Sequence, residues 1–171
     1  MGVICDCSGK EIKKIPVKEI ISFDSFMDHL LTIHNEFRKK HNSPNLTLNP
    51  KLCDMAKDYA KELISNKNKD NTKKYNNEIL GSNIYLSETK DNQPEKIIKK
   101  WYNEKENFDY DYNYFQKNAA HFTQMVWKGT KEIGIGIVEE DKFCLVLFYY
   151  PPGNILGKFT DNVENPNKKK K

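Results

Sequence analysis

Residues 121–130 read His-Phe-Thr-Gln-Met-Val-Trp-Lys-Gly-Thr, and this stretch decides how the rest of the chain is interpreted. It combines an imidazole, a hydroxyl, an amide and a large aromatic ring within ten residues. A plain core segment does not mix groups in this way, because each buried polar group needs a hydrogen-bond partner. The stretch therefore predicts that a functional site lies close to His121.

Two strands are expected downstream of this stretch. Three isoleucines alternate with two glycines over residues 133–137, which predicts a strand with one side reduced to backbone. Residues 143–150 are almost continuously apolar, as in a strand that is buried on both faces. A hairpin is expected around residues 139–141, and Pro151-Pro152-Gly153 ends the second strand.

Upstream, apolar residues at spacings of three and four predict three helices. The first covers residues 23–41, the second follows Asn49 as N-cap with Pro50 at its first position, and the third runs from Pro94 to about Glu104. Residues 66–77 carry one large apolar side chain and are expected to form a long exposed loop. Helices first and strands last predict an α+β domain with helices packed on an antiparallel sheet.

The composition of the 171 residues limits the class of protein. The net charge of +4 is carried by lysine, because Arg38 is the only arginine, so a sequence-reading nucleic-acid binder is not expected. Four cysteines at positions 5, 7, 53 and 144 form no regular disulfide framework, which favours a reducing compartment. We expect neither a secretion signal nor a transmembrane anchor from this sequence.

Several ordered motifs resemble the CAP superfamily (cysteine-rich secretory proteins, antigen 5 and pathogenesis-related 1). Residues 121–130 resemble the first family signature and residues 148–154, Phe-Tyr-Tyr-Pro-Pro-Gly-Asn, resemble the second; residues 34–41 and 101–104 match as well. The likeness runs from residue 23 to about residue 163. It implies an α-β-α sandwich, in which a central antiparallel sheet lies between helical layers. We therefore expect a flexible arm at residues 1–20, a CAP domain at 21–163 and a basic disordered tail at 164–171.

The resemblance also implies a cavity with two histidines and two acids, which bind a divalent metal in several members. His121 and Glu104 match two of these positions, whereas Ser82 replaces the glutamate of the Gly-Glu-Asn motif. The first family histidine is expected near Asn71, where the chain has only asparagine and lysine. Two ligands are too few for a tight zinc site, so we expect no resident cofactor and weak or absent Zn²⁺ binding. We favour a direct hydrogen bond between Glu104 and His121.

Other histidines and one serine have alternative interpretations. His34 and His41 on the first helix are expected to be packing or surface residues, and His29 a surface residue. Ser82, His121 and Glu104 could be nucleophile, base and orienting acid of a hydrolase, although no nucleophile elbow surrounds Ser82. A hydrolase or metal-dependent enzyme at His121 therefore remains an alternative.

The N-terminus suggests membrane attachment. Gly2 is the position that can be myristoylated, and Cys5 and Cys7 are placed for palmitoylation, although Asp6 departs from the preferred pattern. One acyl chain binds membranes only marginally, so the cysteines or Lys168–Lys171 would supply a second signal. An ordinary N-terminus with accidental cysteines is the alternative.

Within the family, the likeness is greatest to the branch of the Golgi-associated plant pathogenesis-related protein, which is myristoylated and faces the cytosol. We expect a non-enzymatic, membrane-associated CAP domain that binds lipid, sterol or a protein partner at the cytoplasmic face of the Golgi or plasma membrane. A homodimer is left open, and nucleic acid is not an expected partner. A secreted, extracellular effector-like binding protein is the alternative.

Overall fold

The computed structural model describes residues 23–65, 72–89 and 92–168. Its three longer helices are α1 (Phe23–Lys40), α2 (Pro50–Ile64) and α3 (Pro94–Asn103), as the sequence predicted. Shorter helices follow at η1 (Glu104–Asn107), η2 (Lys117–Ala119), α4 (Ala120–Val126) and α5 (Phe159–Asn162). None of the helices in these ranges has the length and apolar character to cross a membrane.

The start of α2 shows how local sequence fixes a helix end. The side chain of Asn49 accepts hydrogen bonds from the backbone N–H groups of Lys51 and Leu52, at 3.0 and 3.2 Å. Pro50 occupies the first helical position, where its missing N–H costs nothing. The predicted N-cap is therefore confirmed.

Four strands form the main sheet: β1 (Thr47–Leu48), β4 (Gly81–Ser87), β5 (Glu132–Glu139) and β6 (Phe143–Tyr150). Their order is β1-β5-β6-β4. The long strands β4, β6 and β5 pair antiparallel, as expected, whereas the two-residue β1 runs parallel to β5 and makes the whole sheet mixed. The β5–β6 hairpin turns at the predicted place.

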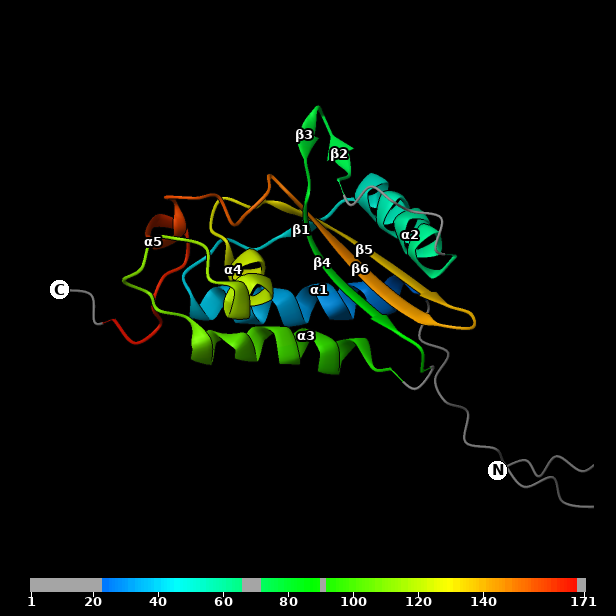
Figure 1. Ribbon diagram of the computed structural model, residues 1–171, viewed down its shortest axis with the longest axis horizontal. Coiled ribbons are helices and arrows are strands. Elements are labelled where there is room, and N and C mark those ends of the chain that lie inside the picture. The colour runs from blue at the N-terminus through cyan, green and yellow to red at the C-terminus, as the bar shows by residue number, and fades with distance from the viewer. Residues whose placement is uncertain (1–22, 66–71, 90–91, 169–171) are drawn as a thin grey trace, which may run out of the picture.

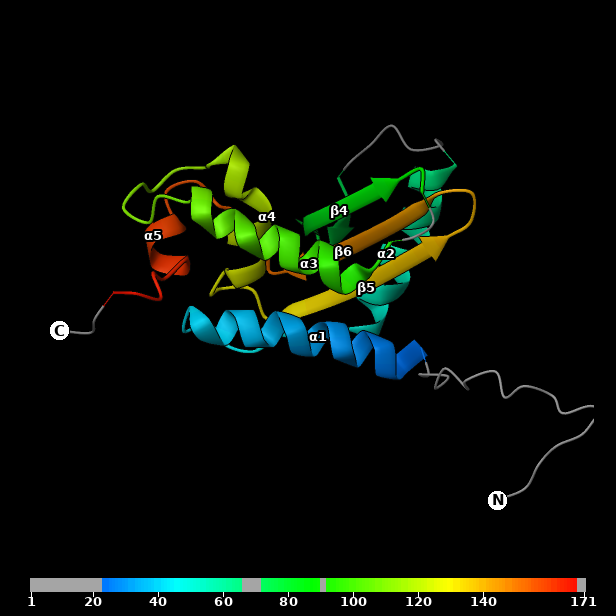
Figure 2. The same cartoon turned by 90° about the horizontal axis from the view of Figure 1, so that it is seen from below.

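Helices cover both faces of this sheet. Figure 1 shows α2 on one side, and α1, α3 and α4 on the other; Figure 2 shows α1 and α3 lying side by side along their layer. The side chains of β6 alternate accordingly: Leu145, Leu147 and Tyr149 belong to the core under α1, α3 and α4, and Val146 and Phe148 to the core under α2. The α-β-α sandwich is thus confirmed.

The two glycines of β5 allow α2 to approach the sheet closely. A Cβ atom on Gly134 would lie 2.2 Å from the carbonyl carbon of Leu52, and one on Gly136 would lie 2.3 Å from that of Ala56. Real Cβ atoms do not approach backbone so closely. The helix therefore packs directly on bare strand backbone, as the alternation of isoleucine and glycine predicted.

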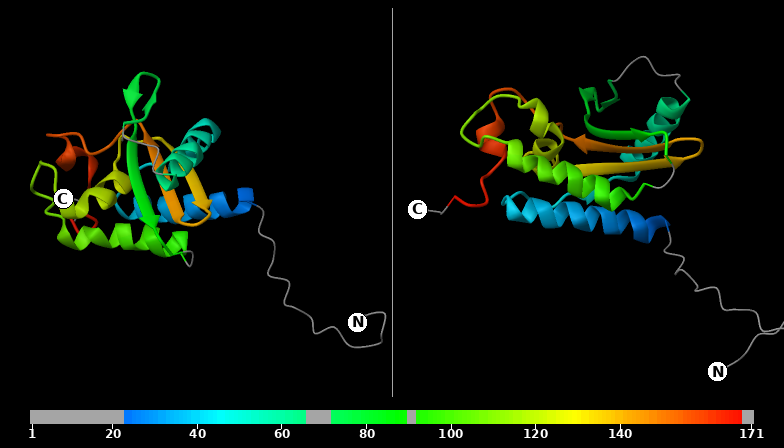
Figure 3. Two further views of the ribbon diagram at one scale, coloured as in Figure 1. Left: turned by 45° about the vertical axis from the view of Figure 1, so that its right-hand side comes forward. Right: turned by 60° about the horizontal axis from the view of Figure 1, so that its bottom comes forward.

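Two expectations are wrong in part. The end of the predicted loop at 66–77 and the two residues that follow it form a short antiparallel hairpin of β2 (Lys74–Tyr75) and β3 (Glu78–Ile79), which projects from the body in Figures 1 and 3. Asn76 and Asn77 make its turn with φ of 50° and 65°, a conformation that asparagine tolerates better than most residues. Composition alone missed this turn.

The second correction concerns the boundary after residue 163. Glu164, assigned to a disordered tail, bonds to the turn that follows α1: its backbone carbonyl accepts a hydrogen bond from His41 Nδ1 at 2.7 Å. Its carboxylate accepts from Asn42 Nδ2 at 2.6 Å. The ordered domain therefore includes Glu164, because this turn offers it two partners.

Candidate functional site

The signature helix α4 is held at its C-terminal end by the chain's one arginine. The buried guanidinium of Arg38 donates hydrogen bonds to the carbonyls of Met125 and Trp127, both at 2.9 Å, and of Thr130 at 3.0 Å. Its Nε donates to the carbonyl of Pro44 at 2.7 Å. Burial lowers the pKa of Arg38 to about 10, so the group remains charged at neutral pH. In the sequence, Arg38 stood out only as the single arginine and as part of the matched segment 34–41, and its buried role was not predicted.

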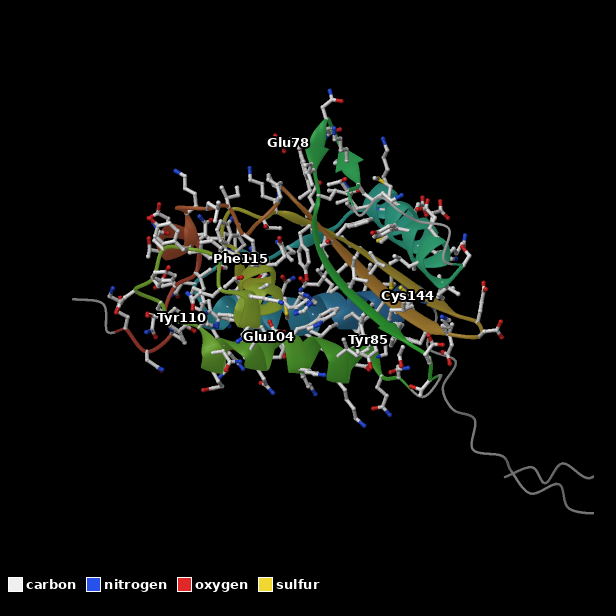
Figure 4. All side chains as sticks on the ribbon, in the orientation of Figure 1. Glu78, Tyr85, Glu104, Tyr110, Phe115 and Cys144 are labelled. Carbon is white, nitrogen blue, oxygen red and sulfur yellow. The ribbon has the colours of Figure 1, made fainter. Side chains whose placement is uncertain are left out.

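Glu104 holds the other end of α4. Its Oε2 accepts hydrogen bonds from the backbone N–H groups of His121 and Phe122, at 3.0 and 3.3 Å. These are among the N-terminal N–H groups that a helix cannot satisfy internally, and a carboxylate there also complements the helix dipole. Glu104 therefore fixes where the signature helix begins; Figure 4 shows its label between α3 and α4.

The same carboxylate fixes the His121 ring. Glu104 Oε1 lies 2.7 Å from His121 Nδ1. Since the carboxylate oxygen accepts, Nδ1 carries the proton and is the donor of this hydrogen bond. The Trp101 ring stacks on the imidazole, with centroids 5.2 Å apart and an interplanar angle of 13°. The predicted hydrogen bond between Glu104 and His121 is present. Both carboxylate oxygens are occupied, and the His121 side chain remains 38% exposed.

A buried chain of polar groups connects α1 to the backbone of α4. Asn83 Nδ2 donates to the carbonyl of His121 at 3.1 Å and lies 3.4 Å from the Tyr149 hydroxyl. The hydroxyl in turn lies 3.1 Å from His34 Nε2, and His34 Nδ1 lies 3.2 Å from the carbonyl of Leu30. A carbonyl can only accept, so Nδ1 carries the proton and Nε2 accepts from tyrosine. Burial lowers the pKa of His34 to about 4 and raises that of Tyr149, which keeps both neutral.

The remaining histidines lie as predicted. His41 is buried, and its Nε2 lies 3.2 Å from the Tyr102 hydroxyl. His29 is exposed on α1. His34 and His41 are thus packing residues that also complete hydrogen bonds.

Ser82 is not brought to the His121 pair. It stands opposite Phe148 in the β4–β6 ladder, and the Phe148 ring packs on Tyr59 of α2. Directly opposed residues share a face of the sheet, so Ser82 is on the α2 side whereas Asn83 is on the α4 side. No hydrogen bond among the described residues joins Ser82 to Glu104 or His121. The serine, histidine and acid of the hydrolase alternative are therefore not assembled.

The metal alternative depends on the same two residues. Across residues 23–65, 72–89 and 92–168, no three His, Cys, Asp or Glu side chains are grouped so that they could hold a metal ion. Glu104 already accepts three hydrogen bonds, and one histidine nitrogen beside it does not make a tight zinc site. The described residues do not fit a tightly bound Zn²⁺. Asn71, Gly2, Cys5, Cys7 and Lys169–Lys171 lie outside the described residues.

The two signature segments pack into one unit. Asn154 Nδ2 donates to the carbonyl of Ala120 at 2.9 Å, and Thr123 Oγ1 donates to Asn154 Oδ1 at 2.6 Å. The backbone N–H of Gly153 donates to Gln124 Oε1 at 3.0 Å. A Cβ atom on Gly153 would lie 2.8 Å from the Gln124 side chain, so this close fit needs glycine. The second signature therefore supports the first from the side.

Beside this unit lies a patch of exposed apolar side chains, which we call the apolar patch. Asn113 joins its two loops: its side chain donates to the carbonyl of Gly157 at 3.0 Å and accepts from the N–H of Thr160 at 3.2 Å. Figure 4 labels Phe115 on this side of the molecule, near α4. The members of the patch, all among the most exposed large apolar residues, are Tyr112, Tyr114, Phe115, Ile155 and Leu156. Residues 108–118 were expected to form a loop, and no local pattern in the sequence indicated that Asn113 of this loop bonds to Gly157 and Thr160.

An α-β-α sandwich with a Glu–His pair at the start of a short signature helix, supported by a second signature, defines a CAP-type domain. A family model described as the cysteine-rich secretory protein family (CAP) matches residues 31–150, and the chain belongs to this family. The resemblance found in the sequence is thus confirmed.

Known relatives agree with this assignment. Golgi-associated plant pathogenesis-related protein 1 of Homo sapiens is 31% identical over 147 residues, which cover 84% of this chain and 95% of that protein. GLIPR1-like protein 1 of Mus musculus is 32% identical over 164 residues, covering 87% of this chain and 68% of that protein. The structure of venom allergen-like protein 4 of Schistosoma mansoni shares the fold with a TM-score of 0.60 and 24% identity, covering 81% of this chain and 92% of that one.

Proposed function

We propose that this chain acts by binding a lipid or sterol at a membrane, and that it is not an enzyme. The apolar patch is the observation that carries the proposal. Soluble proteins seldom expose several large apolar side chains together unless the surface binds something. Leu156 is 69% exposed and Phe115 47% exposed. Outside the patch, the exposed large apolar side chains among the described residues are Ile79 and Leu86.

The Glu104–His121 pair supports a role in binding over one in catalysis. Glu104 is committed to the helix start and to the imidazole, and the candidate nucleophile Ser82 is on the other face of the sheet. The contacts of the pair are thus accounted for by its role in positioning α4 beside the loops of the apolar patch. Its chemistry needs no substrate.

Attachment to membranes forms the second half of the proposal. We expect acylation at Gly2, with Cys5 or Cys7 or the lysines at the C-terminus as the second signal. The name of the human relative, Golgi-associated, supports the Golgi as the site. We expect the protein on the cytoplasmic face of this membrane or of the plasma membrane. Replacing Gly2 with alanine should move the protein from the membrane to the soluble fraction and abolish labelling with a myristate analogue. Protein found unacylated in the medium would favour the extracellular alternative instead.

Titration of purified protein with a fluorescent sterol tests the binding half. Leu156→Ser and Phe115→Ser remove apolar surface from the patch; Ile79→Ser is the matched control, because Ile79 is 51% exposed but lies on the β2–β3 hairpin. Burying one such side chain contributes about 1.5–3 kcal/mol, so each patch variant should bind at least about tenfold more weakly. An equal loss of sterol affinity in the Ile79→Ser control would contradict the assignment of the binding site to the patch. Full sterol affinity in both patch variants would show that the patch does not bind sterol and would leave a protein partner as its ligand.

A further inference from the structure

Helix α3 presents a face that the packing of the domain does not use. Its inner side is buried against α1, α4 and the sheet through Ile97, Ile98, Trp101 and Tyr102. Its outer side carries the exposed Lys96, Lys99 and Lys100, which a spacing of three and four places in one stripe. Within the described residues, these three lysines form no salt bridge.

Two more lysines lie beyond this stripe of three, at the end of α3. Lys40 of α1 and Lys105 of η1 each place Nζ 5.7 Å from the centroid of the Tyr102 ring. Tyr102 itself stacks on Phe37 with centroids 3.9 Å apart, so the two ammonium groups are held over a rigid aromatic pair. We call Lys40, Lys96, Lys99, Lys100 and Lys105 together the lysine face.

The acids near the lysine face do not neutralise the stripe. Glu95 lies 3.9 Å from His29 at the start of α3. Glu106 pairs with Lys105, so it offsets the charge of that member of the lysine face but not of the three lysines on α3. Glu36 lies one helical turn before Lys40 on α1 and lines a hollow with Asn45, and within the described residues it forms no salt bridge with the lysine face. The three lysines in the middle of α3 therefore face solvent as a continuous positive surface.

We propose that the lysine face is the surface that docks this protein on an anionic lipid bilayer, an inference that rests on the proposed membrane association and makes it specific. Figures 2 and 3 show that α1 and α3 form a long layer on the outside of the molecule. Because the three lysines form one stripe along α3, all of them can approach one plane. Lysine acts as a mobile point charge and needs no fixed geometry, which suits fluid lipid headgroups. Each lysine near an anionic leaflet strengthens binding roughly fivefold, so the stripe supplies about 100-fold.

The test measures sedimentation of the full chain, made without acylation, with phosphatidylcholine vesicles that contain or lack phosphatidylserine. The lysine-face variant replaces Lys96, Lys99 and Lys100 with glutamine. The control makes the same replacement at three exposed lysines of α2, on the opposite side of the sheet: Lys51, Lys57 and Lys61. Glutamine has a helix propensity close to that of lysine, so both variants should fold.

The unchanged protein should bind phosphatidylserine vesicles, release them at about 1 M salt, and lose about 100-fold in affinity in the lysine-face variant but less than about threefold in the control. Equal losses in both variants, or binding that does not depend on phosphatidylserine, would overturn the inference. The sterol titration of the apolar patch involves other residues, so either proposal can fail while the other holds.

Discussion

Replacing Arg38 with methionine should strongly destabilise the fold. The substitution keeps an unbranched apolar side chain of similar reach and removes every donor. Four carbonyls then lose the guanidinium as a partner: those of Pro44, Met125, Trp127 and Thr130. The Trp127 carbonyl keeps the hydrogen bond from the Thr130 N–H at 3.1 Å. All four lie around a side chain with no exposed surface, so water does not replace the lost donors without opening the structure.

The magnitude follows from these bonds. A buried acceptor left without a partner costs about 1–3 kcal/mol of unfolding free energy. Removing the guanidinium offsets part of this cost, because burial of the charged group was itself unfavourable, as its lowered pKa indicates. We expect a net loss of about 4 kcal/mol, a large part of the 5–15 kcal/mol that stabilises an ordinary domain. Lysine at position 38 keeps the charge but not the planar fork, so Arg38→Lys should lose about half as much.

Urea unfolding followed by tryptophan fluorescence measures this loss, because Trp101 and Trp127 both lie in the core under α1 and α3. The order of the free energy of unfolding should be wild type, then Arg38→Lys, then Arg38→Met. A methionine variant within about 1 kcal/mol of the wild type would refute the view that Arg38 holds the C-terminal end of α4.

Three further changes test other parts of the structure. Gly136→Ala should cost about 3 kcal/mol in urea unfolding, since its Cβ would meet the backbone of Ala56 at 2.3 Å, and a smaller effect than 1 kcal/mol would contradict that close approach. Glu104→Ala should cost about 2 kcal/mol, because three hydrogen bonds to α4 disappear; thermal unfolding that matches the wild type would reject this role. The pKa of His34 falls from 6.5 to about 4 on folding, so the unfolded chain binds the proton first as the pH drops. Stability should therefore decrease by about 2 kcal/mol between pH 7 and pH 5, and His34→Gln, unlike His29→Gln at the surface, should reduce this dependence.

The sequence predicted the fold closely because its signals are local and repeated. Three local patterns each predicted one kind of element correctly: the alternation of isoleucine and glycine in β5, the continuous apolar run of β6 and the Asn49–Pro50 cap of α2. The β2–β3 hairpin was missed because its turn depends on two asparagines with positive φ inside a strongly polar segment.

The site was harder to predict, because its residues meet through long-range packing. The motif pair Glu104 and His121 followed from the family resemblance, but the position of Ser82 on the α2 side follows from the register of β4 with β6. The hydrogen bonds of Arg38 to α4 and of Asn113 to Gly157 likewise join segments that no local pattern connects. Sequence patterns reveal which elements form, whereas these contacts depend on how the elements dock.

One sterol titration tests directly whether the apolar patch binds a lipid or sterol while the Glu104–His121 pair only positions α4. It compares two variants: Leu156→Ser in the patch, and His121→Asn, whose amide can still donate to Glu104. We expect at least about tenfold weaker binding for Leu156→Ser and a change of less than about twofold for His121→Asn. Binding that is lost in His121→Asn and kept in Leu156→Ser would place the ligand at the histidine and refute the proposed role of the patch.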